Sequence, residues 1–156
     1  MSEADAPEEW PHLAGRLEAG RHVLPVRVYY EDTDFSGLVY HASYLRFMER
    51  GRSDMIRLLG VHHSALAAGE GARLVFVVRR IEIDFLRPAR IDDVLEVVTE
   101  PSEQTAAAFT LAQTVMRGHE RLVRARVQIV LVDETGRPQR LATALPESVT
   151  RWMRSG

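Results

Sequence analysis

Cysteine and lysine are both absent from this chain of 156 residues, and each absence excludes a type of chemistry. Without cysteine, the chain has no disulfide framework and no thiol nucleophile. Without lysine, a lysine Schiff base and a lysine general base are excluded, and every fixed side-chain positive charge is an arginine.

The chain also lacks an excess of positive charge and any long apolar run. Its net charge is -2 and its isoelectric point is about 6.3. Because proteins that bind nucleic acids usually carry a basic face, we expect no nucleic-acid partner. No apolar run reaches the length of a membrane span, and the acidic N-terminal stretch has no hydrophobic signal region. We therefore expect a cytoplasmic protein without a membrane span.

The groups with the most chemical potential are gathered in residues 29–60. A strand of alternating apolar residues ends near Tyr30, and a turn rich in acids follows it. Apolar residues at helical spacing then predict a long helix with Ser43 as its N-cap and Gly60 at its C-terminus. Gly51 in the middle of this helix costs about 1 kcal/mol relative to alanine, which predicts a close approach of the helix to a sheet.

Four further strands joined by short turns are predicted after the helix, and the first of them is rich in valine, isoleucine and phenylalanine. They cover approximately 74–86, 94–99, 107–116 and 122–132. Short turns favour antiparallel pairing, so the sequence predicts an α+β fold in which a five-stranded antiparallel sheet wraps one long central helix. Residues 1–20 are predicted to be a poorly ordered acidic tail, and 21–156 to form a single domain.

The turn before the helix contains the candidate catalytic groups. Asp34 lies a few residues ahead of the helix start, where backbone N–H groups stabilise negative charge on a carbonyl oxygen. A carboxylate in this place acts as a general base or a nucleophile. Gly37 lets the backbone pass close to a ligand, and His41 lies at the helix start. The same residues also fit a turn in which Asp32 and Asp34 only bond to backbone N–H groups.

The run RVYYEDTDFSGLVYHASY at 27–44 closely resembles the hotdog-fold acyl-CoA thioesterases. It is similar to the 4-hydroxybenzoyl-CoA thioesterase family and specifically to its YbgC branch, which is associated with the Tol–Pal envelope system. The resemblance continues through ERGRSDM at 49–55 and PARIDDVLE at 88–96, and extends from about Pro25 to Pro146. It implies a hotdog fold and hydrolysis of acyl-CoA to a free acid and CoA. It implies no metal or redox cofactor, since CoA is part of the substrate.

Matched residue by residue, the resemblance implies roles for the turn. Asp34 takes the place of the catalytic carboxylate, as nucleophile or general base, and His41 that of the oxyanion donor at the helix start. Tyr30 matches a tyrosine implicated in catalysis in this branch. The implied substrate-binding residues are Gly37, Val39, Tyr40, Tyr44 and Arg79. One turn departs from the pattern: the benzoyl-CoA enzyme grips the CoA phosphates with a basic turn, whereas EPSEQ at 100–104 is acidic and polar. Other candidates for that grip are Arg79, Arg80, Arg87 and Arg90.

The resemblance also implies partners and leaves alternatives open. We expect a homotetramer built from dimers, with the active site at a dimer interface, and acyl carrier protein is a further candidate partner. Peripheral association with the inner membrane is an alternative to a purely cytoplasmic location. A dehydratase of 3-hydroxyacyl thioesters that uses His41 and Glu49 is one alternative function. A non-catalytic protein that binds acyl thioesters is another.

Glu49 and the histidine pair His62–His63 are weighed separately. In other hotdog branches the catalytic carboxylate lies on the helix, but Asp34 takes that role in the matching branch. We therefore interpret Glu49 as a solvated side chain paired with neighbouring arginines. The histidine pair lacks a convincing third and fourth ligand, and no glycine-rich phosphate loop accompanies the acids of the turn. No metal site is predicted.

Overall fold

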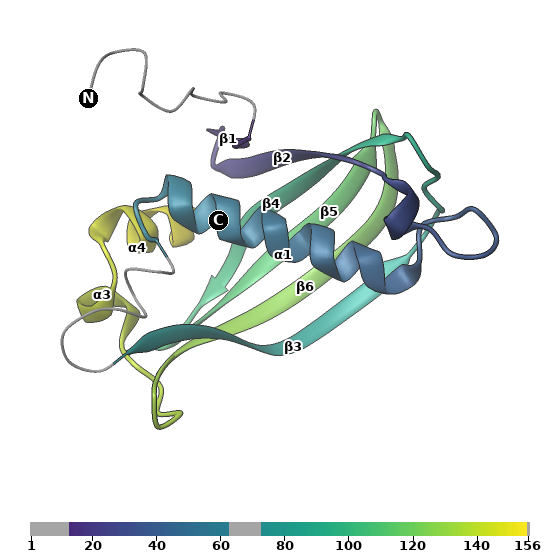
Figure 1. The fold of residues 1–156 in the computed structure, drawn as a ribbon. Coiled ribbons are helices and arrows are strands. Elements are labelled where there is room, and N and C mark those ends of the chain that lie inside the picture. The colour runs from purple at the N-terminus through teal and green to yellow at the C-terminus, as the bar shows by residue number, and fades with distance from the viewer. Residues whose placement is uncertain (1–12, 63–72, 156) are drawn as a thin grey trace, which may run out of the picture.

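One curved antiparallel sheet wraps a long helix in the computed structural model, which describes residues 13–62 and 73–155 (Figure 1). This arrangement confirms the predicted α+β fold with one central helix. The sheet has six strands in the order β1-β2-β4-β5-β6-β3, and all neighbours are antiparallel. The strands are β1 (Arg16–Glu18), β2 (Arg21–Arg27), β3 (Leu74–Phe85), β4 (Val94–Gln104), β5 (Ala108–Arg117) and β6 (Glu120–Asp133).

The predicted number of five strands is wrong by one. The additional strand, β1, pairs with β2 through a tight turn at Ala19 and Gly20, both of which have positive φ. Its three residues fall within the stretch that was predicted to be a tail, and they are too few to show an alternating pattern. The part of that predicted tail at 1–12 lies outside the described residues.

Helix α1 (His41–Leu58) places its apolar stripe on the sheet. Phe47, Met48 and Met55 are among its fully buried side chains. The helix starts earlier than predicted, because Tyr40 is the N-cap and no side chain caps it. Ser43 was therefore wrongly predicted to be the cap: it lies inside the helix and its hydroxyl donates to the carbonyl of Asp32 (3.1 Å).

Gly51 within α1 and Gly60 just after it behave as the sequence predicts. Gly60 follows the helix with a φ of +97° and donates its N–H to the carbonyl of Arg57 at 3.0 Å. At Gly51 a Cβ would lie 2.9 Å from Cγ1 of Val97 and 3.4 Å from Nε2 of Gln113. These distances confirm the close approach of the helix to the sheet, because a methyl group at Gly51 would force its neighbours to move.

Two short helices close the C-terminal end of α1. Helices α3 (Leu141–Ala144) and α4 (Glu147–Met153) lie beside that end in Figure 1. The hydroxyl of Ser148 donates to the carbonyl of Leu59 (2.6 Å), and Trp152 and Met153 are buried. At its opposite, N-terminal end, α1 follows directly from the loop after β2 (Figure 1).

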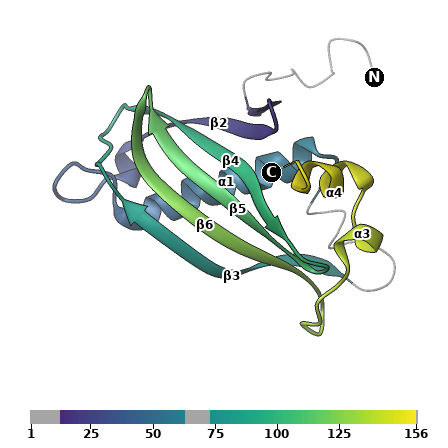
Figure 2. The ribbon, with the colours of Figure 1, turned by 180° about the vertical axis from the view of Figure 1, so that it is seen from behind.

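The outer face of the sheet has no helix over it within the described part of the chain (Figure 2). Ion pairs cross this face: Arg124 of β6 pairs with Asp84 of the neighbouring β3 (3.0 Å), and Arg126 of β6 reaches across β5 to Glu103 of β4 (3.1 Å). Exposed pairs of this kind contribute little to stability, but they make the face polar.

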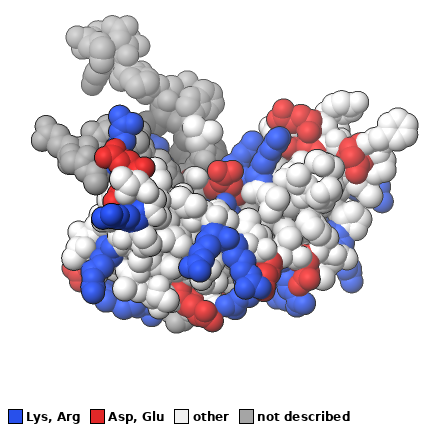
Figure 3. Space-filling view, turned by 90° about the horizontal axis from the view of Figure 1, so that it is seen from below, with Lys and Arg blue, Asp and Glu red and all other residues white. Residues whose placement is uncertain are grey.

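Strand β3 forms one edge of the sheet, and within the described residues it pairs only with β6. Its register shifts between Val78 and Arg80, and Val75, Val77 and Val78 are more than 40% exposed. Figure 3, viewed from the side on which β3 lies in Figure 1, shows arginines and acids interspersed with uncharged surface. Among the described helices, none has the length and apolar character needed to cross a membrane.

Candidate active site

The loop between β2 and α1 projects from the end of the sheet at which α1 begins (Figure 1). A short 3₁₀ helix, η2 (Tyr30–Asp32), leads into it. A bridge between Thr33 and Val39 closes the loop, and the N–H of Asp34 donates to the carbonyl of Leu38 at 2.8 Å. Gly37 has a φ of +81°, a conformation that favours glycine. The loop is therefore a closed turn that carries Asp34 close to its tip.

Asp32 ties the end of β2 to the start of α1. Its carboxylate is buried and accepts the N–H of Tyr29 (2.9 Å). Its carbonyl accepts the N–H of Tyr40 (2.9 Å) and the hydroxyl of Ser43. Asp32 therefore has a structural place in the loop, since both its carboxylate and its carbonyl are bonded inside the protein. The predicted bonding of its carboxylate to the backbone is confirmed.

Ala89, in the connection between β3 and β4, holds the loop from the other side. Its carbonyl accepts the N–H of Val39 and its N–H donates to the hydroxyl of Tyr44, both at 2.9 Å. Ala89 is fully buried and Tyr44 is 3% exposed. Burial raises the pKa of the Tyr44 hydroxyl, which therefore stays protonated at neutral pH. Tyr44 thus anchors the first turns of α1 to the segment that holds the loop.

Asp34 itself is exposed, and its two carboxylate oxygens differ. Oδ1 accepts two hydrogen bonds from Ser36, one from the hydroxyl (2.5 Å) and one from the backbone N–H (2.8 Å). These two bonds lower the pKa of the Asp34 carboxyl, the hydroxyl bond having the larger effect. Smaller contributions to the lowered pKa come from the backbone N–H groups of Leu38 and Asp34, and among the described residues both direct hydrogen bonds go to Oδ1 rather than Oδ2. The carboxylate is therefore ionised at neutral pH, and one of its oxygens is held by Ser36.

The start of α1 offers unpaired backbone donors. No described side chain caps it, and its first turn contains no acid. Such an end carries a partial positive charge and stabilises an oxyanion. The ring of His41, its first residue, lies 4.5 Å from the Tyr40 ring and 6.1 Å from the Phe85 ring. The loop thus places an ionised carboxylate, a donor-rich helix end and exposed aromatic surface in one region.

A family model for the Thioesterase-like superfamily matches residues 28–153. The chain belongs to this superfamily. It is 41% identical over 126 residues to the acyl-CoA thioester hydrolase YbgC of Escherichia coli O6:H1, covering 80% of this chain and 90% of that one. It is 45% identical to the acyl-CoA thioesterase YbgC of Haemophilus influenzae, covering 70% and 79% of the two chains.

A crystal structure of a probable thioesterase from Bartonella henselae is similar to this member of the superfamily. The TM-score is 0.75 and the identity 48%, and the match covers 81% of this chain and 99% of that chain. These likenesses confirm the predicted hotdog fold and the resemblance to the YbgC branch.

The structure brings together only some of the predicted site residues of this thioesterase-like chain. Asp34, Gly37, Tyr40 and His41 lie on the loop and helix start, and Tyr30 is 83% exposed at the foot of the loop. Val39 and Tyr44 are buried, and their polar groups bond to Ala89. Arg79 lies on β3, six residues before Phe85, a separation of about 20 Å along an extended strand.

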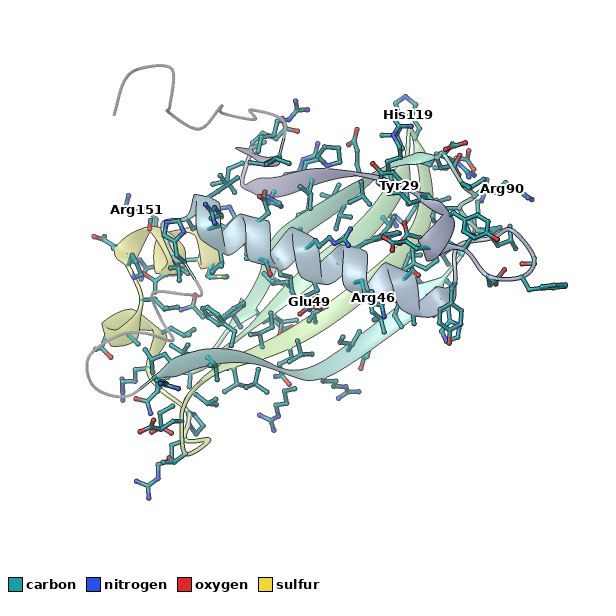
Figure 4. The ribbon with its side chains drawn as sticks, in the orientation of Figure 1. Tyr29, Arg46, Glu49, Arg90, His119 and Arg151 are labelled. Carbon is teal, nitrogen blue, oxygen red and sulfur yellow. The ribbon has the colours of Figure 1, made fainter. Side chains whose placement is uncertain are left out.

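Glu49 is not part of this cluster. It lies eight residues after His41, which is about 12 Å along a helix. Figure 4 shows Glu49 beside Arg46 on the flank of α1, whereas Arg90 lies at the end of the molecule that carries the loop. Glu49 forms no ion pair within the described residues, so the predicted pairing with neighbouring arginines is not seen. One chain therefore does not place His41 and Glu49 in a single dehydratase site.

Three contributors to the site were not singled out from the sequence. Ser36 has a visible signal, because serine two residues after aspartate is a common turn pattern. Phe85 and Ala89 have none, since only the folded sheet brings them to α1. Of the histidine pair, His63 lies outside the described residues. In the part of the chain that is described, no three histidines or acids are grouped closely enough to hold a metal.

Proposed function

We propose that this protein hydrolyses acyl-CoA thioesters to a free acid and CoA. The observation that carries the proposal is the Asp34 carboxylate, which has one oxygen bonded to Ser36, in a loop that runs directly into the uncapped start of α1. The names of the E. coli and H. influenzae relatives, which describe acyl-CoA thioester hydrolysis, support the proposal.

In the proposed reaction, the start of α1 stabilises negative charge and Asp34 supplies the nucleophile or general base. The thioester carbonyl accepts hydrogen bonds from the backbone N–H groups at His41, which stabilise the negative charge that its oxygen gains. The Asp34 carboxylate either attacks the carbonyl carbon or removes a proton from an attacking water. The C–S bond then breaks, and the CoA sulfur leaves and is protonated. In the first route, water subsequently hydrolyses the anhydride that forms on Asp34.

A substrate panel tests the activity. Release of free thiol is measured with short, long and aromatic acyl-CoAs, and with the same acyl groups on acyl carrier protein, our second proposed substrate carrier. We expect turnover with at least one acyl-CoA and accumulation of the free acid. Binding without turnover across the whole panel would contradict hydrolysis and favour a non-catalytic acyl-thioester-binding protein. An unsaturated thioester as the product would indicate a dehydratase.

The pH profile should report the hydrogen bonds to Asp34. Because the reaction requires the carboxylate and these bonds lower its pKa, activity should persist to lower pH than for an unperturbed carboxyl and fall only as pH drops through that lowered pKa. The variant Ser36→Ala loses the larger of the two effects, so the acid limb of kcat/KM should move to higher pH. Thr135→Ala is a matched control, because Thr135 makes the same bond to Asp133 (2.6 Å). An acid limb that is unchanged in Ser36→Ala would count against Asp34.

For the CoA phosphates we propose Arg90 as a contact. Of the four candidate arginines, Arg80 pairs with Glu82 and Arg87 pairs with Glu120. Arg90 has no ion pair within the described residues and its backbone bridges to Leu38 of the loop. Arg90→Ala should raise KM for acyl-CoA about tenfold, the loss expected for one phosphate contact, and leave the acyl-N-acetylcysteamine substrate unaffected. Arg87→Ala is the control, and equal effects on both substrates would contradict the assignment.

We also propose a homotetramer built from dimers, with the unpaired edge of β3 as the dimer contact. An exposed edge with protruding valines favours pairing with a second strand. Light scattering after gel filtration should give four times the chain mass of 17.6 kDa. A monomer mass at micromolar concentration would contradict this proposal.

A further inference from the structure

A cavity of about 90 Å³ lies between the second half of α1 and the strands β3, β5 and β6. Most of its lining is apolar and includes Ile56, Phe76 and Phe109. The rings of Phe76 and Phe109 meet edge to face, with centroids 6.0 Å apart. The volume is several times the minimum that holds one water molecule. The cavity is thus large enough for the end of a ligand chain.

One side of this apolar cavity is polar, because Glu49, Arg52 and Ser53 of α1 also line it. Nη1 of Arg52 donates to Oε1 of Gln113 at 3.0 Å. Gln113 is 1% exposed, and its Nε2 donates to the Met48 carbonyl and to Oγ1 of Thr99, both at 2.9 Å. A fully bonded, buried amide thus holds the guanidinium in place beside the cavity.

The guanidinium of Arg52 is only partly satisfied. It carries five N–H donors, of which one has a partner in the described residues, and that partner is a neutral amide. Among the described residues, no carboxylate lies within ion-pair distance of the Arg52 guanidinium. Burial lowers the pKa of Arg52, and the charge of Glu49 opposes this effect. An anion in the cavity would restore the stabilisation that burial removes.

The flank of α1 beside the cavity carries charges of both signs, and Glu49 and Arg52 are the two that line the cavity itself. Arg46 and Glu49 lie together on this flank in Figure 4. Arg46, Glu49 and Arg52 are spaced three residues apart, so the two arginines leave a net charge of +1 after the glutamate is counted. Glu49 acts on Arg52 only from beyond ion-pair distance, so among the described residues the more buried Arg52 has no carboxylate in direct contact.

We propose that this cavity binds the carboxylate end of an acyl chain, which makes the enzyme selective for ω-carboxyacyl thioesters, the monothioesters of dicarboxylic acids. This inference rests on the proposed function and adds the substrate class. A carboxylate accepts two parallel N–H bonds from a guanidinium, while the methylenes lie against the apolar lining. Arg52 lies eleven residues beyond His41, a rise of about 16 Å along the helix, so the selectivity applies to long chains.

The test compares kcat/KM for dodecanedioyl-CoA with that for dodecanoyl-CoA. We expect the wild type to prefer the dicarboxylic substrate and Arg52→Gln to lower this ratio at least about tenfold, the scale of a charge-assisted hydrogen bond. Glu49→Gln should raise the ratio, because it removes a like charge. It also keeps the proposal testable if Arg52→Gln fails to fold, since Glu49 is exposed. The short pair succinyl-CoA and butanoyl-CoA should show the same ratio in all three proteins.

Equal ratios in the wild type and Arg52→Gln would overturn the proposal. So would a lower ratio in Glu49→Gln, because removal of a negative charge should not weaken the binding of a carboxylate. A binding measurement distinguishes failure of this carboxylate site from failure of the proposed hydrolase function. Dodecanedioate and dodecanoate are titrated into wild type and both variants by calorimetry. An Arg52-dependent preference for the diacid without any thioester turnover would support this site and contradict only the hydrolase. Hydrolysis of dodecanoyl-CoA without any preference for the dicarboxylic substrate would support the hydrolase and contradict the carboxylate site.

Discussion

Asp34→Asn is expected to lower kcat by at least about a hundredfold, the usual scale for loss of a general base, with KM little changed. Asparagine has nearly the same shape and its side-chain oxygen can still accept the hydrogen bonds from Ser36, so the turn is retained. It cannot attack a thioester or take a proton from water. The measurement is thiol release from the best acyl-CoA of the panel, with the unfolding midpoint measured on the same preparation.

Asp133 provides a matched control for this experiment. It lies at the end of β6 and accepts the N–H and the hydroxyl of Thr135, at 2.9 and 2.6 Å, in the same pattern that links Ser36 to Asp34. Hydrogen bonds from Thr135 and Arg137 lower the pKa of Asp133 as well. Asp133→Asn should therefore keep full activity. Near-normal turnover by Asp34→Asn would sink the assignment, and retained activity in Asp34→Ala would favour the dehydratase alternative.

Asp54→Ala is expected to lower the free energy of unfolding by about 3 kcal/mol. Oδ2 of Asp54 on α1 accepts Nε2–H of His22 on β2 at 2.6 Å and the N–H of Gly15 at 2.8 Å. His22 is fully buried and the Asp54 side chain is 13% exposed. Removal of the carboxylate leaves both donors without a partner inside the protein. Chemical denaturation measures the loss, and the slope of the transition should stay unchanged.

Arg151→Ala is the control for the stability measurement. Arg151 pairs with Glu147 across one turn of α4 at 3.0 Å, and both side chains are more than 70% exposed. Figure 4 shows Arg151 at the end of the molecule opposite Arg90. An exposed pair contributes little, so no measurable change is expected. Equal losses in Asp54→Ala and Arg151→Ala would show that the bonds to His22 and Gly15 do not stabilise the fold.

The fold was predictable because its elements carry strong local signals. The apolar stripe of α1 and the apolar residues of β3 to β6 extend far enough to show their periods. Strand β1 has three residues and depends on pairing with β2, so no local sequence pattern predicts it. The error at the start of α1 has a similar cause: Ser43 has the chemistry of a cap, but the carbonyl of Asp32 binds its hydroxyl.

The candidate site was predictable only where its residues are neighbours in sequence. Asp34, Gly37 and His41 belong to one short motif, and their grouping follows from the turn and the resemblance. The anchoring of Tyr44 by Ala89 joins residues that are 45 positions apart, and it depends on how β3 and β4 are connected beside α1. The partly satisfied guanidinium of Arg52 is likewise visible only once its bond to Gln113 beneath the helix is seen.

The position of Ala89 has a consequence for how the protein tolerates internal motion. This one residue bonds to the loop through its carbonyl and to the helix through its N–H. A small displacement of the connection between β3 and β4 therefore carries Val39 and Tyr44 in the same direction. The distance between Val39 and Tyr44, and with it the position of the loop relative to the first turns of α1, is therefore set by this single residue.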